Sequence, residues 1–179
     1  MDTVRLANAT DARDIAQLQI SNWQLTHSVL AQSLDPGDVE STWAQAITIH
    51  GELGRVLVCE RDGTLVGVIA IEFHGELGLI SLLEVAPAVR RQLIGARLLN
   101  AVADIAGQAG CRHMSLWLND DQADAKKFFE SMGWALSGAT RTVSAELVDL
   151  AEPTLAKNAR NSTSEITQQQ CELTTSLSL

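Results

Sequence analysis

One segment of the sequence combines residue types that could bind an anionic ligand. The run 83–99 predicts an apolar strand, a turn marked by Pro87, and a helix that begins near Gly95. Such a helix start directs unpaired backbone N–H groups at one place, where the helix dipole favours negative charge. Arg90 and Arg91 stand beside it. We therefore expect a phosphate or pyrophosphate ligand, with an ordinary strand–helix connection and a solvated arginine pair as the alternative.

The rest of the chain carries helix and strand signals that would hold this segment in place. Alternating or apolar runs predict strands, and a period of about 3.6 residues predicts helices. The expected strands cover 4–6, 55–60, 65–73, 77–85 and 114–118, with weaker signals through 147. Four helices are expected: one after an N-cap at Thr10, one over 39–49, one that begins near Ile94, and one after an N-cap at Asp120 or Asp121.

Two details of these elements bear on the fold. Asp62 and Gly63 form a strong hairpin signal between two strands, because glycine accepts a positive φ without steric penalty. Parallel sheets need crossovers between neighbouring strands, so this hairpin opposes a doubly wound nucleotide-binding domain. The first helix, with Thr10 as its expected N-cap, places one set of side chains on a single face: Ile15, Leu18, Asn22 and Leu25, with Trp23 beside them.

Two segments together resemble the GNAT superfamily of N-acetyltransferases. Val85-Ala86-Pro87, followed by Arg90 and Gly95-Ala96, is similar to its motif A, in which V-x-P precedes an (R/Q)-x-x-G-x-(G/A) loop. A later segment is similar to motif B; it contains Leu116-Trp117-Leu118, Gln122, Ala125, Phe128-Phe129-Glu130 and Gly133-Trp134. The resemblance covers residues 3–145, with both motifs in the expected order.

The resemblance implies a fold, an activity and a binding site. The fold is of the α/β (α+β) class, with a mixed, mostly antiparallel central sheet splayed mid-sheet and helices on both faces. The activity is transfer of an acetyl group from acetyl-CoA to an amine, with no metal. The cofactor-binding residues would be Val85 on the pantetheine arm, the loop Arg90, Arg91, Gln92, Leu93, Ile94, Gly95 and Ala96 at the pyrophosphate, and Gln122 and Phe129 further in.

Three positions depart from the family pattern. Leu93 stands where the loop normally has its first glycine, and its Cβ is expected to crowd the phosphates or to reshape the turn, which in either case lowers affinity without abolishing it. Gln122 replaces the common asparagine. Phe129 replaces the tyrosine that many members use as general acid, and the chain contains no tyrosine. Coenzyme A leaves as a thiolate, and a thiol pKa of about 8.5 makes that a tolerable leaving group. The departures favour a slow or acid-independent enzyme.

Glu84 is the predicted catalytic residue. The attacking amine must lose its proton, and a carboxylate near the cleft could accept it, directly or through water. Glu84 lies next to Val85 near the end of the otherwise apolar run 81–85. Strand alternation puts Glu84 on one face with Leu82, opposite Leu83. A solvated carboxylate at a strand end is the alternative interpretation.

Other candidates for the chemistry are weaker. Glu72, His74 and Glu76 form a second cluster, but they straddle a turn and are expected at the surface. His27 follows the first helix, where the family often builds its acceptor pocket. The main rival function is a GNAT-fold protein that senses acyl-CoA or scaffolds a partner without turnover; Leu93 and Phe129 favour it.

Composition limits the partners and the location. The 179 residues carry a formal net charge of -9, which repels nucleic acid. No run has the roughly 18 apolar residues of a membrane span, and the first residues lack a secretory pattern. We expect a cytoplasmic protein that acts on a small-molecule or peptide amine, binds neither nucleic acid nor membrane, and has a homodimer as one option for its assembly.

Composition also divides the chain. Residues 1–150 are expected to form the GNAT domain, since hydrophobic residues make up 46% of the chain and suffice for one core. Residues 151–179 are mostly polar and uncharged, which predicts a flexible tail, with a docking helix around 164–173 as the alternative. Three cysteines at wide spacings match no disulfide framework or zinc site, so the two in expected strands are interpreted as small core residues.

Overall fold

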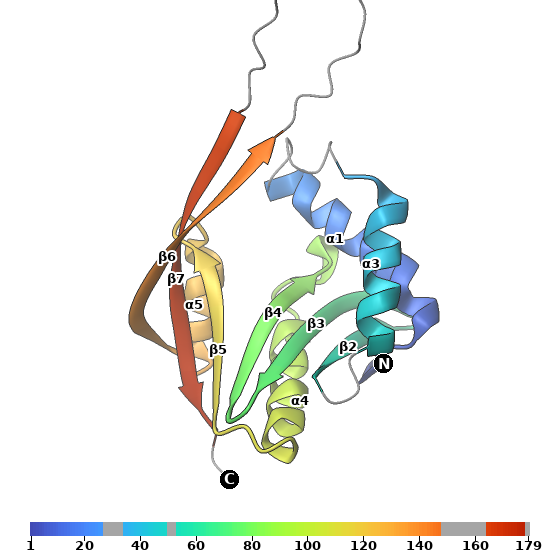
Figure 1. Cartoon of the computed structure of the whole chain (residues 1–179). Helices are drawn as coiled ribbons and strands as arrows, with labels where there is room; N and C mark the ends of the chain where they lie inside the picture. Colours follow the sequence, from blue (N-terminus) through green and yellow to red (C-terminus); the bar gives the residue numbers. More distant parts are fainter. Residues whose placement is uncertain (27–33, 50–52, 148–163, 178–179) are drawn as a thin grey trace, which may run out of the picture.

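The computed structural model describes residues 1–26, 34–49, 53–147 and 164–177. Within these ranges the chain forms helices and strands, which alternate only from β4 to β6 (Figure 1). The elements are, in order, β1 (Asp2–Leu6), η1 (Ala9–Asp11), α1 (Ala12–Thr26), α3 (Pro36–Ile49), β2 (Gly54–Arg61), β3 (Thr64–His74), β4 (Leu77–Val85), η2 (Pro87–Val89), α4 (Ile94–Gln108), β5 (His113–Asn119), α5 (Ala123–Ser131), β6 (Ala135–Leu147) and β7 (Ser164–Ser176).

All seven strands join one sheet, in the order β1-β2-β3-β4-β5-β7-β6. The β4–β5 pair is parallel, and every other neighbouring pair is antiparallel. The β2–β3 hairpin turns at Asp62 and Gly63 with φ values of 51° and 79°, as the sequence predicted. The mixed, mostly antiparallel sheet confirms the predicted fold class.

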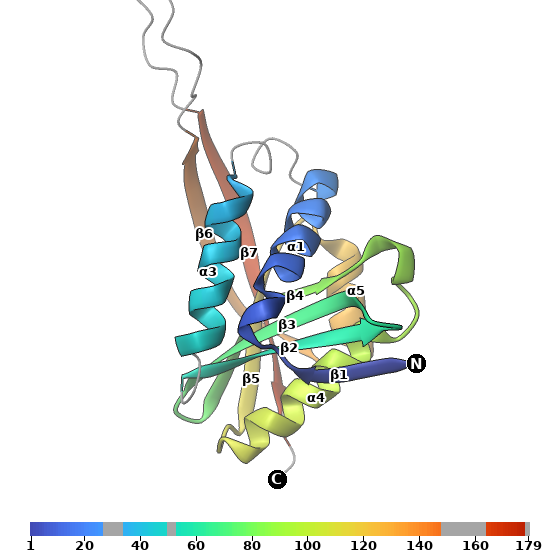
Figure 2. The ribbon, with the colours of Figure 1, turned by 90° about the vertical axis from the view of Figure 1, so that its right-hand side faces the viewer.

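Helices cover both faces of this sheet, with α1 and α3 on one face and α4 and α5 on the other (Figure 2). The α1/α3 face buries one hydrophobic cluster, which includes Ile15, Trp43 and Val68. The α4/α5 face buries a larger one, which includes Leu98 and Phe129. Each fully buried aliphatic or aromatic side chain contributes about 1.5–3 kcal/mol. The three cysteines are free and buried, whereas the sequence predicted a core position for only two of them.

Strand β4 is the element that reaches both clusters. Its side chains alternate, so Leu82 packs against the α1/α3 cluster while Leu83 and Val85 pack against the α4/α5 cluster. Glu84 has the same parity as Leu82 and therefore faces α1, as the alternation predicted. The strand thus carries a carboxylate on one face of the sheet and apolar side chains on the face that holds α4.

The sheet opens between β4 and β5. The two strands pair only from Leu77 to Ile80 on β4 and from His113 to Leu116 on β5. Beyond these residues they diverge, and Figure 1 shows β4 leaning toward α1 while β5 leans toward β6 and β7. The result is two arms, β1 to β4 and β5-β7-β6, joined only at one end. This confirms the predicted splay.

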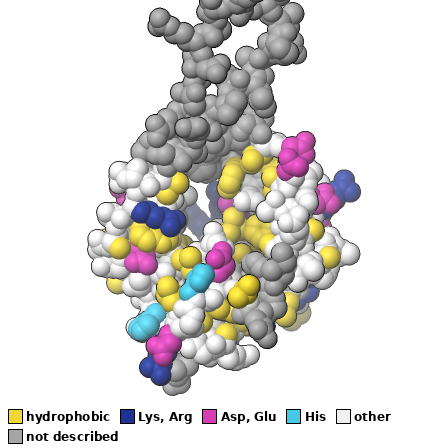
Figure 3. Space-filling model, in the orientation of Figure 1, with side chains coloured by type: hydrophobic (Ala, Val, Ile, Leu, Met, Phe, Trp, Pro, Cys, Tyr) yellow, Lys and Arg dark blue, Asp and Glu magenta, His cyan; other side chains and the backbone are white. Residues whose placement is uncertain are grey.

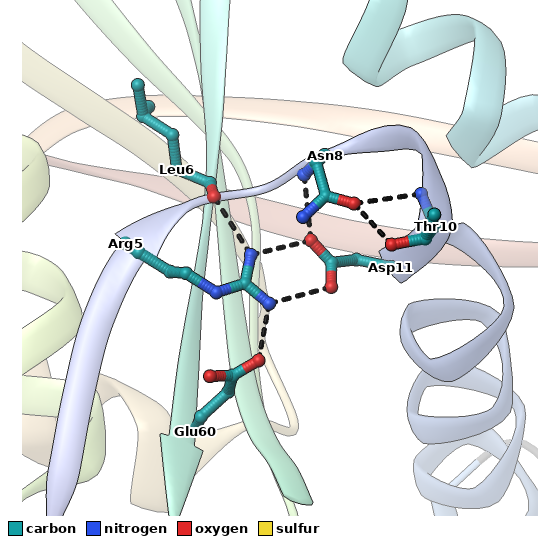
Figure 4. A network of polar contacts seen from close by, with 6 residues as sticks. All are labelled: Arg5, Leu6, Asn8, Thr10, Asp11 and Glu60. Carbon is teal, nitrogen blue, oxygen red and sulfur yellow. Dashed lines mark hydrogen bonds and ion pairs between the residues drawn. The ribbon is translucent and has the colours of Figure 1, made fainter. Parts of the chain in front are cut away.

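A compact ionic network fixes the start of the chain against the first arm (Figure 4). Arg5 of β1 donates to both oxygens of Asp11, at 2.7 and 2.8 Å, and also to Glu60 of β2. The Arg5 hydrogen bonds lower the pKa of Asp11 below its ordinary value. Asn8, and not the predicted Thr10, caps this turn: its side chain accepts from the Thr10 amide while Asp11 accepts from the Asn8 amide.

The last described segment corrects the predicted tail. Ser164–Ser176 is neither a flexible tail nor a docking helix but strand β7, which lies between β5 and β6. Leu173 and Cys171 are buried in the α4/α5 cluster and anchor it. Residues 151–163 and 178–179 of the predicted tail lie outside the described residues.

Candidate active site

A cleft of about 1210 Å³ occupies the opening between the two arms. Its walls come from β4 and β5, its ends from α1, the 89–96 loop and α5. Figure 3 shows the surface hollowed between the two arms, with hydrophobic side chains on both sides of the hollow. Three basic and three acidic side chains line it: Arg90, Arg91, Lys127, Glu84, Asp121 and Asp124. The cleft is therefore less acidic than the chain as a whole, which carries -9.

One end of the cleft is built from backbone amides. Among the described residues, the amides of 91–96 donate none of the backbone–backbone hydrogen bonds that close the turns and caps of the chain. They belong to the loop and to the first turn of α4, where helix geometry leaves N–H groups unpaired. An anion at this place would accept several of them and would also meet the positive end of the helix dipole.

The loop that presents these amides has an unusual backbone. Arg91 and Leu93 have φ values of 61° and 65°, in the left-handed region that residues with a Cβ rarely adopt. Leu93 is the N-cap of α4 and its side chain caps nothing. Leu93 is also 69% exposed, so this side chain lies at the rim of the cleft and does not fill it.

Hydrogen bonds of a side chain hold this backbone from the side of the loop that faces away from the cleft. Gln92 accepts from the Arg61 guanidinium at the end of β2 and donates to the Ala88 carbonyl at 3.3 Å. Arg61 also donates to both oxygens of Asp2, at 2.7 and 3.0 Å, and these bonds lower the pKa of Asp2. The Gln92 side chain is therefore engaged on the side of the loop away from the cleft, and Gln92 is not among the residues that line the cleft.

Gly95 lets the first turn of α4 approach α5 closely. A Cβ at Gly95 would lie 3.3 Å from the ring of Phe128, tighter than most side-chain contacts. Phe128 lines the cleft, so this close approach brings α4 and α5 together beside the predicted phosphate position. A larger residue at Gly95 would have to move the Phe128 ring.

The other end of the cleft is built from side chains. Glu84 lies on the cleft wall and its carboxylate accepts a hydrogen bond from the side-chain amide of Asn22 in α1. Asn22 is only 2% exposed. Its amide nitrogen also lies 3.3 Å from the Val85 carbonyl, and its amide oxygen accepts from Arg90 at 3.1 Å. The predicted base is thus held by a buried polar partner.

The backbone of Val85 turns toward the cleft. The next amide, that of Ala86, donates to Val66 of β3 at 2.9 Å, so by alternation the Val85 amide and carbonyl point the other way. The Val85 carbonyl accepts from Asn22 and, at 3.3 Å, from the Arg90 guanidinium. Its N–H remains as the group for a ligand that runs along β4 as an added strand.

The sequence of this site decides its family. The family model for acetyltransferases of the GNAT type matches residues 14–134, more than half of the chain. The match includes both motifs and both walls of the cleft. The chain belongs to the GNAT acetyltransferase family.

A curated relative agrees with this assignment. The IAA acetyltransferase of Azospirillum brasilense is 36% identical over 86 residues. The aligned region covers 47% of this chain and 56% of the relative, so the chain spans about half of the relative's length.

Solved GNAT-like structures share the whole fold at low identity. An N-acetyltransferase from Staphylococcus aureus Mu50 superposes with a TM-score of 0.71, at 14% identity and 99% coverage of both chains. The Salmonella typhimurium protein yncA, solved with acetyl-CoA as its cofactor, gives 0.68 at 19% identity, over 100% of this chain and 95% of that one. The ribosomal-protein-S18-alanine N-acetyltransferase of Escherichia coli gives 0.67 at 16%, over 100% and 96%. These matches establish the fold.

The GNAT motif B residues lie on the second arm. Gln122 is the N-cap of α5, in place of the predicted Asp120 or Asp121, and its side chain accepts from the Asn119 amide at 3.1 Å. Phe129 is 3% exposed and packs edge-to-face on Trp134, with ring centroids 5.3 Å apart. Both line the cleft, and their contact with a cofactor stays a prediction.

The second candidate cluster lies outside this GNAT cleft. Glu72 is half-buried and His74 is exposed at the end of the β3–β4 hairpin, with 3.4 Å between Glu72 Oε2 and His74 Nε2, and neither lines the cleft. Glu76, in the same hairpin, pairs with Arg112 at 3.3 Å. His27 lies outside the described residues.

Asn22 is the functional candidate that sequence reasoning did not select. The helix pattern placed it correctly on an apolar face, between Leu18 and Leu25. A polar amide in an apolar stripe was the available signal, because a buried amide needs hydrogen-bond partners. Those partners, Glu84 and Arg90, lie 62 and 68 residues further along the chain.

No helix among the described residues has the length and apolar character needed to cross a membrane.

Proposed function

We propose that this GNAT-family chain is an acetyl-CoA-dependent N-acetyltransferase that acetylates a primary amine of a small molecule or a peptide. The observation that carries the proposal is the split sheet itself. It sets unpaired amides of α4 at one end of a cleft and a carboxylate, Glu84, on the wall facing α1. Both ends belong to the same cleft, so a long anionic thioester bound by the amides could bring its acyl group to an amine near Glu84.

The groups that line the cleft support coenzyme A as its ligand. The amides of 91–96 would hold the pyrophosphate, with Arg91 and Lys127 as nearby cations. The Val85 N–H would bind the pantetheine arm as it passes along β4. Leu93 keeps its side chain at the rim, which leaves the cleft interior open despite the missing glycine.

The reaction would proceed by direct attack in a ternary complex. The amine nitrogen forms a bond to the thioester carbonyl carbon, the carbon–sulfur bond breaks, and coenzyme A leaves as its thiolate. Glu84 accepts the proton that the amine loses, directly or through a water molecule. Phe129 has no hydroxyl to donate, so water would protonate the thiolate. The pKa of the corresponding thiol is about 8.5.

The acceptor is an amine in this proposal because the family and its neighbours act on such groups. The Escherichia coli neighbour is a ribosomal-protein-alanine N-acetyltransferase, which motivates peptide amines alongside small ones. A cytoplasmic location and a homodimer stay part of the proposal.

One specific observation favours a second candidate, an acyl-CoA-binding sensor or scaffold without turnover. Phe129 is buried against Trp134, where a hydroxyl-bearing general acid would be expected. The sensor would use the same amides and the same cleft but no acceptor amine.

Two measurements test the proposal. Calorimetric titration with acetyl-CoA should give saturable binding, and no heat at millimolar ligand would overturn both candidates. Release of free thiol should then be followed over a panel of primary amines that includes polyamines, amino acids and short peptides with free N-termini. Turnover with any of them supports the enzyme, whereas tight binding with no turnover over the whole panel supports the sensor.

A further inference from the structure

Asn22 stands between two charged side chains of the cleft wall. Its amide nitrogen donates to Glu84, and its amide oxygen accepts from the Arg90 guanidinium at 3.1 Å. The same nitrogen lies 3.3 Å from the Val85 carbonyl, to which Arg90 also donates at 3.3 Å. Three elements therefore meet at one buried amide: α1, the end of β4, and the 89–96 loop.

The chemistry of this position requires an amide. An ionised carboxylate only accepts hydrogen bonds, and a guanidinium only donates them. A side chain that stands between them must donate on one side and accept on the other, which an asparagine amide does with its two ends. These needs also fix the orientation of the Asn22 amide, with nitrogen toward Glu84 and oxygen toward Arg90.

We propose that Asn22 is a positioning residue, which fixes the Glu84 carboxylate and the Arg90 guanidinium together on the cleft wall. Arg90 then orders the wall of the cleft and is not a phosphate ligand. The catalytic part of this inference rests on the proposed transfer reaction. The contact network itself does not, since it consists of groups of the protein alone.

The first test separates binding from turnover. In Asn22→Asp the new side chain keeps its volume and can still accept from Arg90, but it faces Glu84 with a like charge. We expect kcat to fall roughly tenfold to a hundredfold, the size of effect that misplacing a reacting group produces, while the KM for acetyl-CoA changes less than about twofold. An unchanged kcat would overturn the positioning role.

The second test asks what Arg90 does. In Arg90→Met we expect the calorimetric Kd for coenzyme A to stay within about twofold, because the guanidinium is engaged by Asn22 and Val85. In Arg91→Met, which removes a cleft cation without these bonds, we expect a weakening of roughly tenfold, typical of one charged contact. A Kd at least tenfold weaker in Arg90→Met would overturn the assignment.

The third test needs no activity. Glu84→Gln supplies an amide that can donate to the carboxylate of Asn22→Asp, so the double variant restores complementarity. We expect it to unfold in urea at a higher midpoint than Asn22→Asp alone. Additive midpoints would overturn the network, whether or not the protein acetylates amines. Absence of turnover in the unsubstituted protein would count against the proposed function only.

A matched control lies one helical turn earlier in α1. Gln19 accepts from the indole N–H of Trp43 at 2.8 Å and does not line the cleft. Gln19→Met removes a comparable side-chain amide, so we expect a small loss of stability and an unchanged kcat. A loss of kcat equal to that of Asn22→Asp would show that the effect comes from disturbing α1 in general and would overturn the specific role of Asn22.

Discussion

The two ends of the cleft present different kinds of chemical group. At the α4 end the binding groups are backbone amides, and the nearby side chains of Gln92 and Leu93 face away from the cleft or lie at its rim. At the α1 end the working groups are side chains, Glu84, Asn22 and Arg90, held by hydrogen bonds to one another. One end depends on the path of the chain and the other on residue identity.

This difference explains why the family pattern can be broken at one end without closing the site. A backbone site tolerates a leucine in place of glycine as long as the chain still reaches the required φ, and Leu93 does, at 65°. A side-chain site has no such tolerance, because a carboxylate, an amide and a guanidinium have fixed donor and acceptor roles. The predictions below test this contrast, from the largest expected effect to the smallest.

Glu84→Gln should affect only the side-chain end. The substitution keeps the shape of the side chain but removes its ability to accept a proton, so we expect kcat to fall about 10²–10⁴-fold, the usual contribution of a general base. The calorimetric Kd for coenzyme A should stay within about twofold. A variant with normal turnover would remove Glu84 from the mechanism.

Gly95→Val should affect only the backbone end. The new Cβ would lie 3.3 Å from the Phe128 ring, and the added methyl groups would crowd the amides of the first turn. We expect coenzyme A binding to weaken roughly tenfold or more, equivalent to about 1.4 kcal/mol. Gly107→Val in the same helix is the matched control, since a Cβ there meets nothing within 4 Å. Equal Kd values in the two variants would contradict the close approach.

Arg61→Met tests whether the loop is held from outside the cleft. The substitution removes the hydrogen bond to Gln92, and because this bond is exposed to solvent we expect the Kd for coenzyme A to rise only about threefold. Asp2→Asn is the comparison, because it weakens the Arg61 ion pair but leaves the Gln92 contact. If both variants lower affinity equally, the tie through Gln92 is not what holds the loop.

Leu93→Gly should give the smallest change, in the opposite direction. A left-handed conformation costs a residue with a Cβ about 1–2 kcal/mol, and the extra freedom of glycine offsets about 0.5–1 kcal/mol of the gain. We expect coenzyme A to bind about twofold more tightly by calorimetry. Weaker binding would show that the Leu93 side chain itself contacts the ligand.

The β4–loop–α4 region could be predicted from sequence because its signals are local. The predicted strand 77–85 has the bounds of β4 in the structure. The turn at Pro87 and the start of α4 at Ile94 were also predicted correctly. Strand alternation also placed Glu84 on the correct face. These features depend on neighbours within a few residues, which a sequence displays directly.

Two features could not be predicted because their causes lie far along the chain. Strand β7 buries the side chains of Cys171 and Leu173. Its remaining residues are held in the sheet by pairing with β5 on one side and β6 on the other. Its polar composition resembles that of a disordered tail, since composition does not encode pairing. The role of Asn22 likewise depends on partners more than 60 residues away.

The position of β7 sets an order of events during synthesis. Strand β6 leaves the ribosome before β7, yet its neighbour in the finished sheet is β7 and not β5. Hairpins of the first arm can close while the chain is still growing, but β6 must wait for the later segment to enter between it and β5. The wall of the cleft that holds Phe128 is therefore completed last, so an unfinished chain would carry Glu84 and the amide loop with only half of a binding site.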